Sequence, residues 1–235
     1  MREGDPPTDD VAASLAGGTV RFFGLELRCE ENVLVPRAET ELLARTALDL
    51  LSPPEAGATS PLTLLDLGCG AGNLTCALAW HLPAAHVWAC DLSPDAVRLT
   101  RRNADDLGLG ERVTVRRGDL FDALAGDRDR LLGQVDAILC NPPYLSSSRV
   151  EAQLEGPLAR EPRAACDGGP FGIAFHQRVA REAGSWLRPG GRLLFEVGAG
   201  QARQVVRLLE RAGGYRKTMQ VADAGGVGRV VWARR

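Results

Sequence analysis

Apolar runs of strand length alternate with amphipathic stretches of helix length over most of the chain. The apolar runs predict strands over residues 62–67, 86–91, 112–117, 135–140 and 191–197. The amphipathic stretches predict helices over residues 73–82, 94–107, 172–187 and 200–212. A chain that alternates strands and helices in this way builds a parallel sheet with helices on both faces and right-handed crossovers.

The pattern changes at the C-terminal end. Gly213-Gly214 ends the last helix, and residues 215–222 and 229–233 then predict two strands joined by a glycine turn, so that they can pair antiparallel. The expected fold class is therefore α/β, with a Rossmann-like, seven-stranded, mostly parallel sheet whose last strand is antiparallel.

The residues before the main sheet have a different organisation. Patchy alternation over residues 19–28, a turn at 30–32 and the apolar residues 33–35 predict a β-hairpin. A helix is expected to open at residues 36–41, and residues 52–60 have the composition of a linker. We therefore expect a disordered or loosely attached N-terminus (1–18), a hairpin, helix and linker extension (19–60) and a main α/β domain (61–235).

Composition and charge narrow the class of protein. The chain has 235 residues and a net charge of −2, so no basic field predicts an extended nucleic-acid surface. Its six cysteines form no C-x-x-C pair, which argues against a zinc site or a disulfide framework, and no metal is expected. No apolar run has membrane-spanning length, and residues 1–10 do not read as a signal peptide, so we expect a cytoplasmic protein.

A glycine loop follows the first predicted sheet strand. Asp66-Leu67-Gly68-Cys69-Gly70-Ala71-Gly72 places glycines where a strand must turn sharply and where a ligand can approach the backbone closely. Asp91 closes the next strand about 20 residues later, the position of an acid that accepts hydrogen bonds from ribose hydroxyls. The loop and the acid together predict a nucleoside cofactor, although the glycine spacing differs from the dinucleotide fingerprint.

Two more loops at strand ends carry candidate chemistry. In Gly118-Asp119-Leu120, the acid could accept a hydrogen bond from an adenine amine while Leu120 packs on the ring. A surface turn is the alternative. Asn141-Pro142-Pro143-Tyr144 is a stiff turn directly after a buried strand. It would hold the Asn141 side-chain oxygen and the Pro142 carbonyl as two acceptors for an –NH2 group, with Tyr144 as a stacking face.

These motifs, in this order, resemble those of the S-adenosylmethionine-dependent amino-methyltransferases. Two further segments, Val35-Pro36-Arg37-Ala38-Glu39-Thr40-Glu41 and the stretch from Glu161 to Gly169, resemble the family that methylates a glutamine of bacterial peptide-chain release factors at N5. Leu187 to Gly191 and Phe195-Glu196-Val197-Gly198 with Gln201 are also similar. The likeness covers residues 19–235.

The resemblance implies S-adenosyl-L-methionine as the cofactor and three groups of site residues. The cofactor site would comprise Asp66, Gly68, Cys69, Gly70, Gly72, Asp91, Leu92, Asp119, Leu120 and Asn141. The catalytic group would be Asn141, Pro142 and Tyr144. The substrate site would comprise Arg37, Glu39, Thr40, Asn141, Pro142, Pro143 and Tyr144. The implied partner is a release factor or another protein with an exposed glutamine loop.

The sequence also departs from the family pattern. Ala38 replaces a proline, and residues 168–172 replace the usual Asp-Gly-Leu. Family members carry a helical N-terminal domain, whereas fewer than twenty residues precede the hairpin here, so a weaker grip on a release factor (a raised KM) is expected.

Several functions remain open at this stage. A paralogue that methylates a small-molecule amide or amine would share the chemistry, as would a nucleic-acid N-methyltransferase, which the scattered arginines do not favour. A nicotinamide oxidoreductase or a catalytically silent nucleoside-binding module would not explain Asn141 to Tyr144.

Overall fold

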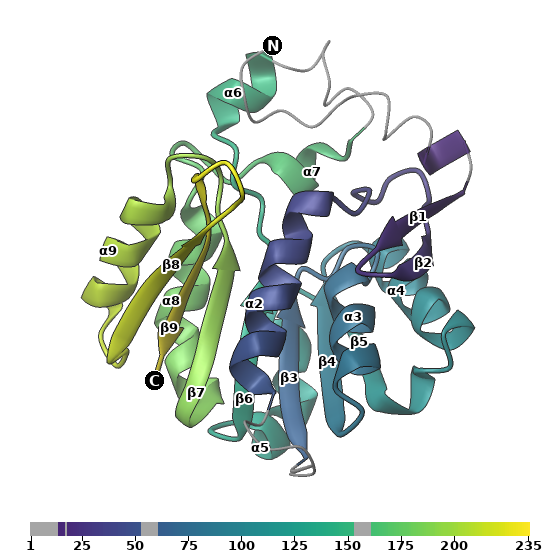
Figure 1. The fold of residues 1–235 in the computed structure, drawn as a ribbon, viewed down its shortest axis with the longest axis horizontal. Coiled ribbons are helices and arrows are strands. Elements are labelled where there is room, and N and C mark those ends of the chain that lie inside the picture. The colour runs from purple at the N-terminus through teal and green to yellow at the C-terminus, as the bar shows by residue number, and fades with distance from the viewer. Residues whose placement is uncertain (1–13, 17, 53–60, 153–160) are drawn as a thin grey trace.

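The computed structural model describes residues 14–16, 18–52, 61–152 and 161–235, and a seven-stranded sheet lies at its centre (Figure 1). The strands of this sheet are β3 (Leu62–Leu67), β4 (Ala85–Asp91), β5 (Val113–Arg117), β6 (Val135–Cys140), β7 (Leu187–Glu196), β8 (Lys217–Ala222) and β9 (Gly228–Arg234). Their order is β5-β4-β3-β6-β7-β9-β8, and β9 runs antiparallel to both of its neighbours. The predicted fold class is confirmed.

Helices cover both faces of the sheet. The helices of the chain include α2 (Glu41–Leu51), α3 (Asn73–His81), α4 (Pro94–Asp106), α5 (Arg128–Leu131), α6 (Ser147–Ala152), α7 (Arg163–Cys166), α8 (Ala174–Trp186) and α9 (Ala202–Ala212), of which α6 and α7 lie beyond the ends of the strands (Figure 1). Leu64 packs with α2 and α3 on one face, and its neighbour Leu65 packs with α8 and α9 on the other. Consecutive strand residues point to opposite faces, so each buried strand contributes to two cores.

Most predicted elements agree with the structure to within a few residues. The strand predicted over 135–140 is β6, and every one of its residues is buried, as expected for a central parallel strand. Ser93 caps α4 by accepting a hydrogen bond from the amide of Ala96, with Pro94 at the first helical position. β7 begins at Leu187 rather than at residue 191, and α2 begins at Glu41, after a short 3-10 helix (Ala38–Thr40).

The hairpin prediction was right in kind but wrong in its strands. β1 (Thr19–Phe22) pairs with β2 (Leu25–Arg28) across a two-residue turn at Phe23-Gly24, whose φ angles of 49° and 82° are both positive, as a type I′ turn requires. Residues 33–35 form no strand. Val33 is buried because it packs against Ala71 and Leu99, so its apolar character comes from this contact.

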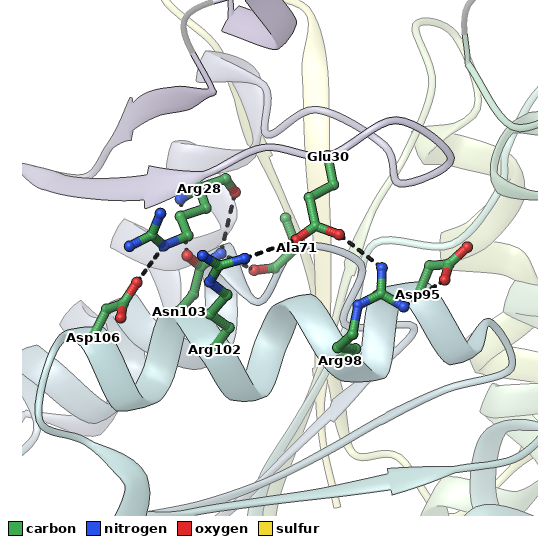
Figure 2. Close-up of polar contacts among 8 residues, drawn as sticks. All are labelled: Arg28, Glu30, Ala71, Asp95, Arg98, Arg102, Asn103 and Asp106. Carbon is green, nitrogen blue, oxygen red and sulfur yellow. Dashed lines mark hydrogen bonds and ion pairs between the residues drawn. The ribbon is translucent and has the colours of Figure 1, made fainter.

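One buried asparagine docks the hairpin onto the main domain (Figure 2). Asn103, on α4, accepts a hydrogen bond from the amide of Arg28 at 2.8 Å and donates to the carbonyls of Arg28 and Ala71 at 3.2 and 2.8 Å. Ala71 belongs to the glycine loop. The same side chain therefore ties the N-terminal extension, α4 and the glycine loop together.

Candidate functional site

The predicted site residues follow neighbouring strands at one edge of the sheet. Leu67, the last residue of β3, pairs with Cys90 of β4 on one side and with Cys140 of β6 on the other. The glycine loop, Asp91 and Asn141 follow these three residues, so they lie at the same edge. The strand order reverses at β3, and ligands of open α/β sheets bind at such a switch point.

The glycine loop has space for a ligand above it. Gly68, Gly70 and Gly72 all have positive φ angles, and a Cβ added at Gly68 or Gly70 would meet nothing within 4 Å. A Cβ at Gly72 would instead lie 2.9 Å from Cγ2 of Thr100, so Gly72 permits close packing against α4. Cys69 is buried, and its sulfur accepts a hydrogen bond from the Thr100 hydroxyl. The first two glycines are thus the ones available for close approach to a ligand.

Asp66 lies fully buried directly before the glycine loop. Its Oδ2 accepts a hydrogen bond of 2.6 Å from the hydroxyl of Thr75, while its Oδ1 has no hydrogen-bond partner within the described part of the chain. Burial raises the pKa of this carboxyl to about 6, against the opposing effect of the Thr75 hydrogen bonds. A buried acceptor without a partner is what a ligand donor could satisfy.

Asp91 is held in place by the backbone around it. Its Oδ2 accepts from the amide of Gly70 at 3.0 Å and its Oδ1 from the amide of Ser93 at 2.9 Å. Burial raises the pKa of the carboxyl, and these backbone hydrogen bonds oppose that rise. Each carboxylate oxygen can accept a further hydrogen bond, so this geometry is compatible with the role of Asp91 toward two ribose hydroxyls, which stays a prediction. The neighbouring Leu92 side chain is exposed.

The loop after β5 already has partners within the chain. Asp119 forms a bidentate ion pair with Arg178 of α8, at 2.9 and 3.2 Å. Leu120 is buried with a positive φ of 49°, and its carbonyl accepts a hydrogen bond from the Cys90 thiol. A role of Asp119 toward an adenine amine stays a prediction, and any such amine would share the carboxylate with Arg178.

Asn141 has a defined orientation. Its Nδ2 donates to the hydroxyl of Thr40 at 3.1 Å, which leaves Oδ1 as the acceptor end of the amide for a ligand. The contact joins residues 101 positions apart. It brings together one residue from the predicted substrate segment and one from the predicted catalytic turn.

Gln201 and two glycines contact the backbone of the turn that follows Asn141. Nε2 of Gln201 donates to the Tyr144 carbonyl at 2.8 Å, while Oε1 of Gln201 accepts from the amide of Gly198. A Cβ at Gly172 would lie 2.3 Å from the Tyr144 carbonyl oxygen, and one at Gly168 would lie 2.5 Å from that of Pro143. The segment that departs from the family pattern therefore packs closely on the turn and restrains it.

A buried ion pair joins the two segments that flank the turn. Arg37 contacts Glu161 at 2.7 Å, and their side chains are only 15% and 1% exposed. Burial raises the pKa of Glu161, and the Arg37 guanidinium opposes that rise. Arg37 thus has a structural partner already, and its predicted role in substrate binding, like that of Glu39, stays a prediction.

Sequence reasoning assigned no role to Glu196, which closes β7 beside Asn141. It is 3% exposed, and burial raises its pKa to about 7, while hydrogen bonding with the Thr40 and Tyr144 side chains opposes the rise. Its Oε2 lacks a hydrogen-bond partner among the residues described. The sequence signal that could have identified Glu196 is an acid directly after the apolar run of a buried strand.

Other features of the structure lie outside this site. An open depression of about 560 Å³ runs beside α4, where Arg98 and Arg102 pair with Glu30 (Figure 2). Within the ranges that the structure covers, no cluster of three or more His, Cys, Asp or Glu side chains could hold a metal ion, and no helix could span a membrane. All six cysteines are buried free thiols.

The open glycines, the fixed carboxylate of Asp91 and the unpartnered Oδ1 of Asp66 fit the nucleoside and amino-acid groups of S-adenosylmethionine. Residues 54–169 match the methyltransferase small domain family. A crystal structure of the T. thermophilus 16S rRNA N2 G1207 methyltransferase in complex with AdoMet and guanosine has a similar fold, with a TM-score of 0.63 at 21% identity over 92% of this chain and 49% of that one. These matches place the chain in the class of S-adenosylmethionine-dependent methyltransferases.

Two relatives identify the family within this class. The release factor glutamine methyltransferase of Moorella thermoacetica is 35% identical over 93% of this chain and 73% of its own length. The protein of the same name from Geobacter sulfurreducens is 38% identical over 92% of this chain and 71% of its own length. The chain belongs to the release factor glutamine methyltransferase family.

Proposed function

We propose that this protein transfers a methyl group from S-adenosylmethionine to the side-chain amide nitrogen of a glutamine in a peptide-chain release factor. The observation that carries the proposal is the Asn141–Thr40 hydrogen bond, because it uses the Nδ2 of Asn141 and leaves Oδ1 as the acceptor end of the amide. An amide –NH2 group is a donor, and this end of Asn141 is its complement.

The chain's own residues orient the acceptor nitrogen. Asn141 Oδ1 and the Pro142 carbonyl would accept the two amide hydrogens, which fixes the nitrogen and turns its lone pair outward. Contacts with Gln201, Gly168 and Gly172 restrain the turn before substrate binds, which supports a preorganised role for it. S-adenosylmethionine supplies the electrophilic methyl group when bound, and Asp91 with the glycine loop would hold its nucleoside part.

In this proposal, most of the rate enhancement comes from positioning the two reactants. Orienting two reactants can contribute ~7–11 kcal/mol in favourable cases. A general base is not required before transfer, since the amide proton becomes acidic only after methylation and can then leave to water.

The test uses purified release factor from the same host and labelled S-adenosylmethionine. We expect label on the release factor, and we expect it to vanish when the glutamine at the tip of its substrate loop is changed to alanine. Absence of label on the release factor, with label on a small molecule from the host lysate, would overturn the release-factor proposal in favour of a small-molecule methyltransferase.

A further inference from the structure

Glu196 is a buried acid that the proposed chemistry does not use, although it lies beside the residue that binds the substrate amide. Phe195 of β7 pairs with Cys140 of β6, so Glu196 and Asn141 follow paired residues on adjacent strands. Removing a carboxyl from water is costly unless hydrogen bonds compensate. Hydrogen bonding with the side chains of Thr40 and Tyr144 opposes the effect of burial on the pKa of this carboxyl, and both residues belong to the predicted site.

The hydroxyl of Thr40 is available for such a network because it does not cap α2. It is the N-cap residue of α2, where a threonine hydroxyl commonly accepts from a backbone amide of the first turn. Here the hydroxyl makes no capping hydrogen bond, and it accepts from Asn141 Nδ2 instead. Thr40 is only 1% exposed, so water does not offer its hydroxyl proton an alternative acceptor.

A hydroxyl carries a single proton, so the direction of that proton determines the other contacts of the oxygen. If the Thr40 proton points to the carboxyl of Glu196, the Thr40 oxygen is left to accept from Asn141 Nδ2. If the proton points to Asn141, the amide must turn over. Its Nδ2 would then face the substrate –NH2, and two donors would oppose each other.

We propose that Glu196 and Thr40 are positioning residues that hold the Asn141 amide with its oxygen toward the substrate. The relay runs from the Glu196 carboxyl to the Thr40 hydroxyl and on to Asn141 Nδ2. This inference rests on the proposed function, because the orientation matters only if Asn141 accepts from an –NH2 group.

The test compares two disruptive variants with two conservative ones in the full chain. E196L and T40V keep approximate volume but remove the acceptor or the hydroxyl, and E196Q and T40S retain them. We expect E196L and T40V to lower kcat for methylation of the release factor by about 10–100-fold, the scale of a misplaced catalytic group, with KM and cofactor Kd changed less. T40S and E196Q should recover most of the activity.

Matched controls come from outside the site. T46V removes a buried hydroxyl from the same helix, one that donates to the Leu42 carbonyl of its own turn, and E210Q changes an exposed acid on α9. Both should leave kcat unchanged. Normal kcat in E196L and T40V would overturn the relay, as would equal losses in T40V and T46V.

A second measurement separates the relay from the proposed function and also serves if E196L does not fold. The side-chain 15N resonance of Asn141, assigned by its loss in N141D, should shift in T40V and E196L but not in T46V or E210Q, in protein without substrate. A shift in the disruptive variants with no methylation of the release factor by wild type would support the relay and refute the release-factor substrate. An unchanged resonance in T40V, in a wild type that methylates the release factor, would overturn the relay alone.

Discussion

Asp91 shows how one side chain can be both part of the scaffold and a ligand-binding group. Its two carboxylate oxygens each accept one backbone amide, from Gly70 and Ser93, and each retains capacity for a further donor. The carboxylate is therefore fixed before cofactor binds, and the entropy cost of ordering it is not incurred at that step.

The prediction for Asp91 concerns affinity. D91A should weaken S-adenosylmethionine binding by about 2–4 kcal/mol, because a charged acceptor for hydroxyl groups is lost. Calorimetric titration measures the change. D95N is the matched control, since Asp95 lies on the first turn of α4 and pairs with Arg98 at the surface. Equal Kd values for D91A and wild type would refute the assignment.

Asn141 separates binding from chemistry. N141A removes one preorganised polar group, so kcat should fall by roughly two to three orders of magnitude, whereas cofactor Kd should change much less. Steady-state kinetics and a parallel calorimetric titration make the comparison. If Kd rises by as much as kcat falls, Asn141 serves mainly as a cofactor ligand.

At the scale of elements, the hairpin and the glycine loop share one attachment point on α4. Asn103 is buried and satisfies the backbone amide and carbonyl of Arg28 and the carbonyl of Ala71. The exposed Arg28–Asp106 ion pair lies beside it, with side chains 44% and 46% exposed (Figure 2). The two contacts join the same elements but differ in burial.

This difference predicts unequal costs of mutation. N103A should lower the free energy of unfolding by about 2–4 kcal/mol, because it removes the partner of the buried Ala71 carbonyl and of the part-buried amide and carbonyl of Arg28. D106N should change it by at most about 0.5 kcal/mol, as expected for an exposed pair. Urea denaturation of both variants tests the ranking, and a cost for D106N equal to that of N103A would show that the exposed pair docks the hairpin.

The sequence predicted the sheet well because its strands are short apolar runs with glycine and proline at their ends. It misplaced the hairpin because Phe23-Gly24 lies inside an alternating stretch, and a two-residue turn leaves the alternation unbroken. Phe23 adopts a positive φ while its amide donates to Glu41 and its ring contacts His81. Those contacts are long-range and have no local signature.

The same reasoning explains which site residues were predicted. Asp91 is the last residue of β4 and Asn141 directly follows β6, so topology alone places them together. The role of Glu196 depends on Thr40, which lies far away in the chain and reaches it only through the packing of α2 against the sheet. Spacing in sequence carries no information about such a contact.

At the scale of the whole molecule, the stability of the folded protein should depend on pH because an acid is buried in it. The pKa of Glu196 rises from 4.5 to about 7 in the folded protein, chiefly because burial disfavours its charged form. A carboxyl whose pKa is raised in the folded state contributes its full stabilisation at pH values below its pKa in the unfolded state. That stabilisation is lost as the pH rises through the pKa of the carboxyl in the folded state. The relevant window is therefore pH 4.5 to about 7.

E196Q removes this titration and keeps the shape of the side chain. Relative to wild type, the variant should gain stability as pH rises through the window, by about 3 kcal/mol between pH 4.5 and 8, since one pKa unit corresponds to 1.36 kcal/mol. Urea denaturation at several pH values gives the difference, and E210Q serves as the control because it removes an exposed acid outside the site. A difference between E196Q and wild type that does not change with pH would show that Glu196 titrates as an ordinary exposed acid does, and that its burial does not control its charge.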